Sequence, residues 1–118
     1  MKETKTSLRK KLDTRWAERV KEKGYCEYCG KETHLNAHHF YSRTALSTRW
    51  ELDNGFCLCS GHHVLISKFS AHKSPADFVE WAVKKRGIGW YDRLRKKHEQ
   101  IAKFTIDDYK EKLKGLND

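Results

Sequence analysis

The chain has 118 residues, 37% of them hydrophobic, and its 25 Lys and Arg outnumber 16 Asp and Glu to give a formal net charge of +9. This length fits one domain and excludes a multidomain machine. No apolar run reaches the roughly 18 residues of a transmembrane helix, and the N-terminal segment lacks the apolar stretch of a secretory signal, so we expect a cytoplasmic protein.

Residues 6–23 have the pattern of a helix, with Thr6 or Ser7 as its cap and Gly24 after its end. Apolar side chains recur at every fourth position, which predicts one buried face. These side chains are Leu8, Leu12, Trp16 and Val20.

The middle of the chain predicts a small β element followed by a helix. Two short strands are expected near 35–40 and 55–58, joined by a polar loop over 42–53. A helix is expected to begin near His62 or His63. Its apolar residues are Val64, Leu65, Ile66 and Phe69.

A second helical region begins at Pro75, with Ser74 as N-cap and Asp77 completing a capping-box-like start, and runs from there to about Arg86, before Gly87. A basic helix around 90–101 follows. Thr105 then caps a last helix over 106–114, which Gly115 ends. We therefore predict a single α+β, mostly helical domain over 1–118, with an N-terminal basic helix (1–24), a metal-stapled core (25–70) and C-terminal helices (71–118).

The four cysteines suggest a metal site, because paired cysteines in a reducing compartment bind metal more often than they form disulfides. Cys26 and Cys29 have the spacing of a zinc knuckle, and Cys59 and His62 repeat that spacing. We predict that these four residues hold a structural Zn²⁺, with Cys57 buried on the strand. Pairing of Cys57 with Cys59, or four free thiols in a core, are the alternatives.

The segment between the two pairs is longer than in a simple zinc ribbon. It contains His38 and His39 on the first expected strand and Asn54 at the second, and His63 directly follows the second pair. In this order the residues from 25 to 69 resemble the HNH endonucleases, whose ββα-metal motif carries a His pair, an Asn and a final His.

The resemblance implies catalytic roles for four residues. His38 and His63 would bind a catalytic divalent ion, His39 would be the general base, and Asn54 would fix the loop and the base. The chemistry fits, because neighbouring residues on a strand face opposite sides and an imidazole is suited to taking a proton near pH 7. An exchange of roles between His62 and His63 stays open.

The chain departs from the family at one position. Some members carry a further His one turn after the last one, where this chain has Ser67. Two protein ligands would favour Mg²⁺ or Mn²⁺ over tightly bound Zn²⁺. We expect His34, His72 and His98 to lie at the surface or to face DNA, although His72 is near enough in sequence to be a substitute ligand.

The C-terminal half is similar to phage recombination nucleases of the NinG type in segments 69–73, 78–81, 90–94 and 109–113, which extends the resemblance over about 24–116. It implies a phage-encoded endonuclease that acts in the host cytoplasm on recombination or replication intermediates, as branched or duplex DNA.

The basic segments 1–24 and 83–103 favour a polyphosphate partner, because Lys and Arg release counterions from DNA. Solvated helix faces are the alternative, and Trp90 and Tyr91 either stack on bases or pack between helices. The candidate DNA-binding residues are Arg43, Arg49, Lys84, Lys85, Arg86, Arg93, Arg95, Lys96 and Lys97.

Two rival functions stay open at this level. One is a zinc-ribbon module that binds DNA without catalysis. The other is a packaging or homing HNH nuclease that cuts linear duplex DNA. A homodimer would be natural if both strands are cut symmetrically, and the sequence fixes neither the oligomeric state nor the choice between nicking and double-strand cleavage.

Overall fold

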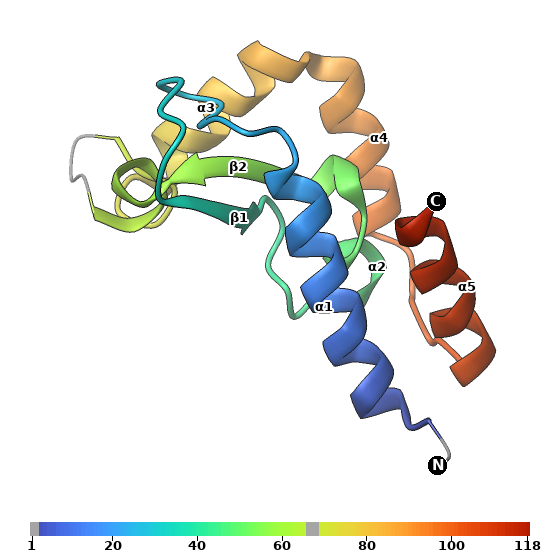
Figure 1. Ribbon diagram of the computed structural model, residues 1–118. Coiled ribbons are helices and arrows are strands. Elements are labelled where there is room, and N and C mark those ends of the chain that lie inside the picture. Colours follow the sequence, from blue (N-terminus) through green and yellow to red (C-terminus); the bar gives the residue numbers. More distant parts are fainter. Residues whose placement is uncertain (1–2, 66–68) are drawn as a thin grey trace.

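The computed structural model describes residues 3–65 and 69–118 and is an α+β fold, mostly helical, with one two-stranded sheet (Figure 1). The strands are antiparallel and pair from Leu35 opposite Cys59 to His39 opposite Gly55. In chain order the elements are α1 (Lys5–Lys21), β1 (Leu35–His39), α2 (Leu46–Arg49), the 3₁₀ turn η1 (Leu52–Asn54), β2 (Gly55–Cys59), the wide helical turn η2 (Gly61–Leu65), α3 (Pro75–Arg86), α4 (Ile88–His98) and α5 (Ile106–Asn117).

Helix α1 begins one residue before the predicted start. The Thr4 side chain accepts a hydrogen bond from the Ser7 backbone N–H, and the Ser7 hydroxyl accepts one from the Thr4 N–H. This reciprocal cap makes Thr4 the N-cap in place of Thr6 or Ser7. The predicted apolar face is confirmed, with Val20 half-buried and Leu8, Leu12 and Trp16 fully buried.

The sheet lies between two hydrophobic cores, because alternate strand residues face opposite sides. Ala37 and His39 face α1, whereas His38, Phe56 and Leu58 face α3 and α4. The core on the α1 side consists of Leu8, Leu12, Trp16, Trp50, Tyr109 and Leu116. The other core includes Phe56, Leu58, Phe78, Ala82, Trp90 and Leu94.

The two strands were predicted to within one residue at each end, but the structure of the loop between them was not predicted. The predicted loop over 42–53 contains α2 and most of η1. Residues Leu46–Arg49 become helical because Trp50, at the end of α2, is buried in the α1-side core. The helix expected from His62 starts at Gly61 as η2, and its continuation through Ile66 and Ser67 lies outside the described residues.

The C-terminal helices match the prediction except at their ends. Helix α3 runs from Pro75 to Arg86 as predicted, but the Ser74 hydroxyl bonds the Ser70 backbone and does not cap the helix. Helix α4 begins at Ile88 and ends at His98, not at 90 and 101, because Gly87 at φ +92° lets the chain turn at once into a new helix.

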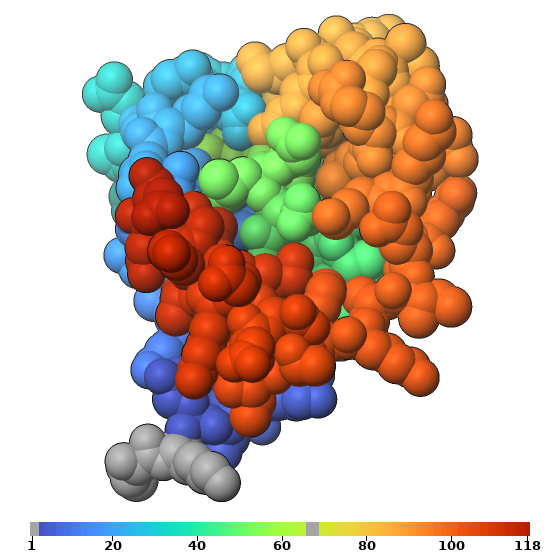
Figure 2. Space-filling model, turned by 90° about the vertical axis from the view of Figure 1, so that its right-hand side faces the viewer, coloured from blue at the N-terminus to red at the C-terminus, as the bar shows by residue number. Residues whose placement is uncertain are grey.

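Helix α5 packs along α1 and closes the α1-side core, as the red helix over the blue one in Figure 2 shows. Thr105 caps α5 with Asp108, as its predicted position requires. The helix continues through Gly115 because Leu116, one residue further, is buried against α1. In the described part of the chain, no helix has the length and apolar character needed to cross a membrane.

Candidate metal centres and the histidine cavity

The segment after α1 forms a tight knuckle that presents two thiols. The Cys26 N–H donates to the Lys31 carbonyl, and the Gly30 N–H donates to the Cys26 carbonyl, both at 2.8 Å. Gly30 has φ +81°, a conformation that favours glycine. The turn brings the side chain of Cys29 beside that of Cys26, as the two-residue spacing predicts.

The knuckle faces the end of β2 and η2, so that Cys26, Cys29, Cys59 and His62 converge. Their ligand atoms all lie within 4.8 Å of one another. The Cys29 and Cys59 sulfurs are 3.8 Å apart, and the Cys59 sulfur is 3.2 Å from His62 Nδ1. A tetrahedral zinc with Zn–S bonds of about 2.3 Å separates its sulfurs by about 3.8 Å. The predicted set of ligands thus forms a cluster that could hold a metal ion such as zinc.

The surroundings of Cys26 favour its thiolate, which is the form that binds metal. Burial raises the pKa of the Cys26 thiol. Backbone N–H groups of Cys59, Cys29 and Tyr28 outweigh burial, so that the pKa is lowered overall. Cys57 is fully buried outside this cluster, and burial raises the pKa of its thiol.

A second cluster brings together His38, His63 and His72, whose ligand nitrogens also lie within 4.8 Å of one another. The His63 and His72 Nε2 atoms are 3.1 Å apart. The backbone sets this geometry, because the His72 N–H donates to the His63 carbonyl at 3.0 Å and the Ala71 N–H to the His62 carbonyl at 2.8 Å. The structure therefore places His72 beside His38 and His63, with its side chain exposed at the surface.

Asn36 is a site residue that the sequence reasoning missed. Its Oδ1 lies 3.3 Å from His63 Nδ1. When Nδ1 donates to this oxygen, the Nε2 lone pair of His63 faces the cluster, which is the usual way a protein orients a metal-binding imidazole. The signal in the sequence was its position two residues before His38, on the same face of β1.

Two of the three imidazoles, those of His38 and His63, have pKa values well below the ordinary value for histidine. Burial, and then the charges of His63 and His72, lower the pKa of His38 to about 3. Burial, and then the charge of His72, lower the pKa of His63 to about 4. At pH 7 both rings are therefore neutral, which is the form that binds metal.

His39 faces the other side of β1, as the strand alternation predicts. Its ring is stacked on Trp16, with centroids 3.9 Å apart and planes at 12°. Its Nε2 lies 3.0 Å from the Arg49 carbonyl oxygen, which can only accept, so Nε2 carries the proton and Nδ1 the free lone pair. Burial lowers the pKa of His39, although the Arg49 carbonyl acts in the opposite direction.

A cavity of about 450 Å³ joins the two histidine environments. We call it the histidine cavity. It is lined by Ala37, His38, His39, Phe40, Ser42, Arg43, His63, Ala71, His72, Pro75, Phe78 and Val79. The side chains of a cluster that could hold a metal ion and the side chain of His39 therefore line one space.

Asn54 is fully buried and fixes the chain that leaves β1. Its Oδ1 accepts a hydrogen bond from the Tyr41 N–H at 2.7 Å, and its Nδ2 donates to the Tyr41 carbonyl at 3.1 Å. The Asn54 carbonyl accepts from the Phe40 N–H at 2.8 Å. This geometry agrees with a loop-fixing role for Asn54 and gives it no direct contact with the cluster.

We expect Asn54→Ala to lower the free energy of unfolding by about 2 to 4 kcal/mol, because two part-buried backbone groups of Tyr41 lose their partner. Urea unfolding monitored by circular dichroism measures this loss. Asn117→Ala is the control, since its side chain bonds Arg15 at the exposed surface, and we expect a change below about 0.5 kcal/mol. Equal losses in both variants would show that the Asn54 bonds contribute nothing special.

Two of the candidate DNA-binding arginines are occupied by contacts inside the protein. Arg49 makes two hydrogen bonds to Asp13, and 14% of its side chain is exposed. Arg86 binds the buried Glu27 and the Gly55 carbonyl, and lies over the Phe56 ring. These contacts give both arginines a structural role, so they are not available to DNA in this conformation.

The remaining candidates lie at the surface. Arg43 lines the histidine cavity and its side chain is 64% exposed, with one long contact to Asp13. In the part of the chain that the structure describes, no ion pair holds Arg93, Lys96 or Lys97 of α4. Lys84 pairs with Glu80, Arg95 pairs with Asp92 and Glu99, and Lys85 lies over the ring of Trp81.

Trp90 packs between helices and does not face solvent. It is 5% exposed, its Nε1 donates to the Asp53 carbonyl at 2.9 Å, and its ring packs against Phe40 and Phe56. Of the two open interpretations of Trp90, helix packing is the one that the structure shows.

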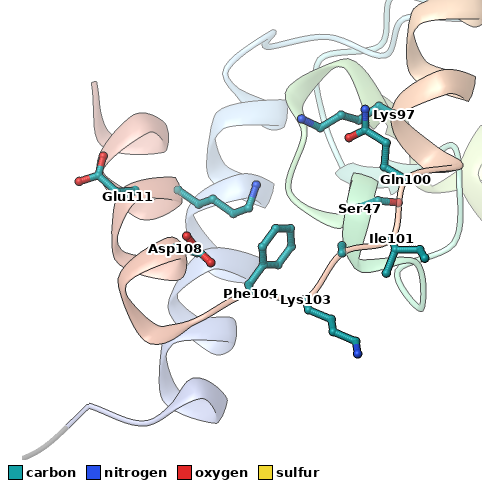
Figure 3. A pocket seen from close by; sticks show the side chains of 10 residues that line it. Ser47, Lys97, Gln100, Ile101, Lys103, Phe104, Asp108 and Glu111 are labelled. Atoms are coloured by element: carbon teal, nitrogen blue, oxygen red, sulfur yellow. The ribbon is translucent and has the colours of Figure 1, made fainter.

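A second cavity, of about 350 Å³, lies where α2, the segment after α4 and α5 meet (Figure 3). Lys97, Lys103 and Lys112 line it together with Asp108 and Glu111, so the charges largely offset each other. None of the described residues around it is a histidine or a cysteine. It therefore offers no catalytic chemistry comparable to that of the histidine cavity.

Comparison with known proteins leaves the family open, since no protein-family model, no curated protein and no solved structure matches the chain. The function consequently rests on the chemistry of the two clusters and of the histidine cavity.

Proposed function

We propose that the protein is a metal-dependent DNA endonuclease of the HNH type, which hydrolyses phosphodiester bonds. The observation that carries this proposal is the meeting of two groups in the histidine cavity. One is the cluster of His38, His63 and His72, and the other is His39 with a free Nδ1. The zinc-ribbon alternative assigns no task to either group.

The geometry of the cavity supports a separate role for His39, for the three-histidine cluster and for Arg43. His39 takes the proton of the attacking water on Nδ1, because the Arg49 carbonyl occupies the opposite nitrogen. An ion bound by the three-histidine cluster would supply Lewis-acid stabilisation of the charge that develops on the phosphate. Arg43, exposed at the rim of the cavity, is suited to hold a phosphate oxygen with its guanidinium fork.

The donor set also bears on which ion is used. Three imidazole nitrogens suit zinc, nickel, copper and iron, whereas magnesium prefers oxygen ligands. With His72 as a third ligand, we propose that the site binds a first-row transition ion. Within that series Mn²⁺ would bind most weakly, and Mg²⁺ would bind more weakly still. This changes the preference that two ligands alone predict.

The substrate class follows from charge and from the sequence resemblance. The net charge of +9, with Arg43, Arg93, Lys96 and Lys97 unburied, suits a nucleic acid. The similarity to NinG-type phage nucleases favours branched recombination or replication intermediates, with duplex DNA as the wider class.

The test is cleavage of a supercoiled plasmid and a four-way junction by the wild type and by His39→Ala, with Mn²⁺, Co²⁺, Ni²⁺, Zn²⁺ or Mg²⁺. We expect the wild type to cut, and the variant to cut about 10²- to 10⁴-fold more slowly, which is the usual contribution of a general base. DNA binding, measured by gel shift, should be unchanged. His34→Asn serves as the control, since His34 is exposed at φ +55° and Asn tolerates that conformation.

Each other outcome selects a rival. Binding without cleavage under every ion would establish the non-catalytic zinc-ribbon module. Equal cutting of linear duplex and junction would favour a packaging or homing nuclease over a recombination enzyme.

A further inference from the structure

We infer that Asp13 and Trp16 of α1 are positioning residues for His39, so that the N-terminal helix belongs to the catalytic apparatus. This inference rests on the proposed function, because it concerns the group proposed there as general base. Asp13 and Trp16 lie three residues apart on α1, which places both on one face of the helix. Trp16 acts on the plane of the His39 ring, and Asp13 acts on which ring nitrogen carries the proton.

Trp16 fixes the plane of the ring. The two rings lie parallel, 3.9 Å apart, and Trp16 is 2% exposed. Trp16 cannot turn away easily, because its Nε1 donates to the Glu51 carbonyl at 2.8 Å. The indole is thus held in place through its Nε1 atom, and the imidazole of His39 stacks flat on its face.

Asp13 fixes the carbonyl that orients the ring. Its carboxylate accepts two hydrogen bonds from the Arg49 side chain, at 3.0 and 2.7 Å, and one from Trp50 Nε1 at 2.8 Å. The Arg49 carbonyl in turn accepts from His39 Nε2. Asp13 therefore holds the end of α2 in the place where that carbonyl selects which nitrogen of His39 carries the proton.

The charge state of Asp13 suits this task. Burial raises the pKa of its carboxyl, but the hydrogen bonds from Arg49 and Trp50 outweigh burial and lower it overall. Asp13 is therefore a carboxylate at neutral pH and a full acceptor for both side chains.

Gly55 makes the approach of α1 to His39 possible. It pairs with His39 across the two strands. A Cβ at this position would lie 2.4 Å from Val20 Cγ2 and 3.0 Å from Trp16 Cζ2, both of them side-chain atoms of α1. Only glycine leaves the room that the indole needs beside the His39 ring.

A merely structural role of Asp13 and Trp16 would predict lower stability and nothing more. A positioning role predicts a change in His39 itself. The difference can be measured in the zinc-loaded protein by ¹⁵N NMR of labelled histidines, which distinguishes the two neutral tautomers. His39→Ala assigns the signal.

The variants are Trp16→Leu, which removes the stacked ring, and Asp13→Asn, which removes the charge. Tyr109→Phe is the matched control, because it loosens the α1–α5 contact by removing the Arg9 hydrogen bond without touching His39. We expect both test variants to lose the pure Nε2–H signature of His39. Their kcat for DNA cleavage should fall about 10- to 100-fold, as misplacement of a reacting group does, with KM unchanged.

The control should keep the wild-type tautomer and kcat. If folded Trp16→Leu and Asp13→Asn also keep both, the positioning role is wrong. If the wild type cuts no DNA, the proposed nuclease function fails, and the NMR signature still decides whether Asp13 and Trp16 orient His39.

Discussion

Removal of the ion from the cluster of Cys26, Cys29, Cys59 and His62 is expected to unfold the protein. The cluster ties the knuckle to the end of β2 and to η2, next to a sheet of only two five-residue strands. Two-stranded sheets are marginal in water. A structural zinc contributes about 10 to 16 kcal/mol in small domains, whereas the net stability of a domain is only about 5 to 15 kcal/mol.

Circular dichroism during titration with EDTA measures this expectation, together with zinc content before and after. Cys59→Ala should bind less than one equivalent of zinc and fail to give a cooperative thermal transition. Cys57→Ala is the matched control, because this fully buried thiol lies on the same strand outside the cluster. It should cost about 1 kcal/mol, as the loss of one buried heavy atom does. An EDTA-treated protein that melts like the untreated one would contradict a structural role for the cluster.

The cysteine cluster could be predicted from sequence because its information is local. Two ligands three residues apart on a tight turn reach one point whatever the rest of the fold does. The same holds for the opposite orientations of His38 and His39, which follow from the pleat of a strand. The pattern of α1 was equally local, because a four-residue repeat of apolar side chains on a helix has one face.

Contacts between residues that lie far apart in the chain could not be predicted from the sequence. His72 joins His63 through two backbone hydrogen bonds between 62–63 and 71–72, which no spacing rule describes. Arg86 was expected to bind DNA because it ends a basic run. In the structure it forms an ion pair with the buried Glu27, which lies 59 residues earlier in the chain. The sequence does not show which group a charged side chain will pair with. For Arg86 the partner is a buried carboxylate inside the protein.

The part played by α1 at the histidine cavity was hidden for the same reason. Asp13 and Trp16 look like a solvated acid and a core aromatic when they are taken alone. Their significance depends on Arg49, whose side chain and carbonyl connect Asp13 to His39. The HNH resemblance begins at residue 25, or at residue 24 when the NinG-type segments are included. Helix α1 lies before it and carries no motif, so only the fold relates α1 to His39.

Replacing a member of the histidine cluster is expected to abolish the second metal site and leave the first intact. The wild type should bind one Co²⁺ or Zn²⁺ beyond the structural ion. His63→Ala should lose this second equivalent, because it removes a half-buried neutral imidazole from the cluster. Asn36→Ala removes only the partner of His63 Nδ1, and should weaken binding about 10- to 100-fold.

His72→Ala decides between the two hypotheses about the number of ligands. If three histidines bind the ion, isothermal titration with Co²⁺ should show a weaker second site in His72→Ala, DNA cleavage should fall with it, and the control His34→Asn should match the wild type. If His38 and His63 suffice, His72→Ala will bind as the wild type does, and the preference returns to Mg²⁺ or Mn²⁺ with oxygen ligands completing the shell. The 3.1 Å between the His63 and His72 Nε2 atoms favours the first result, because two imidazole nitrogens this close either share one proton or bind one ion.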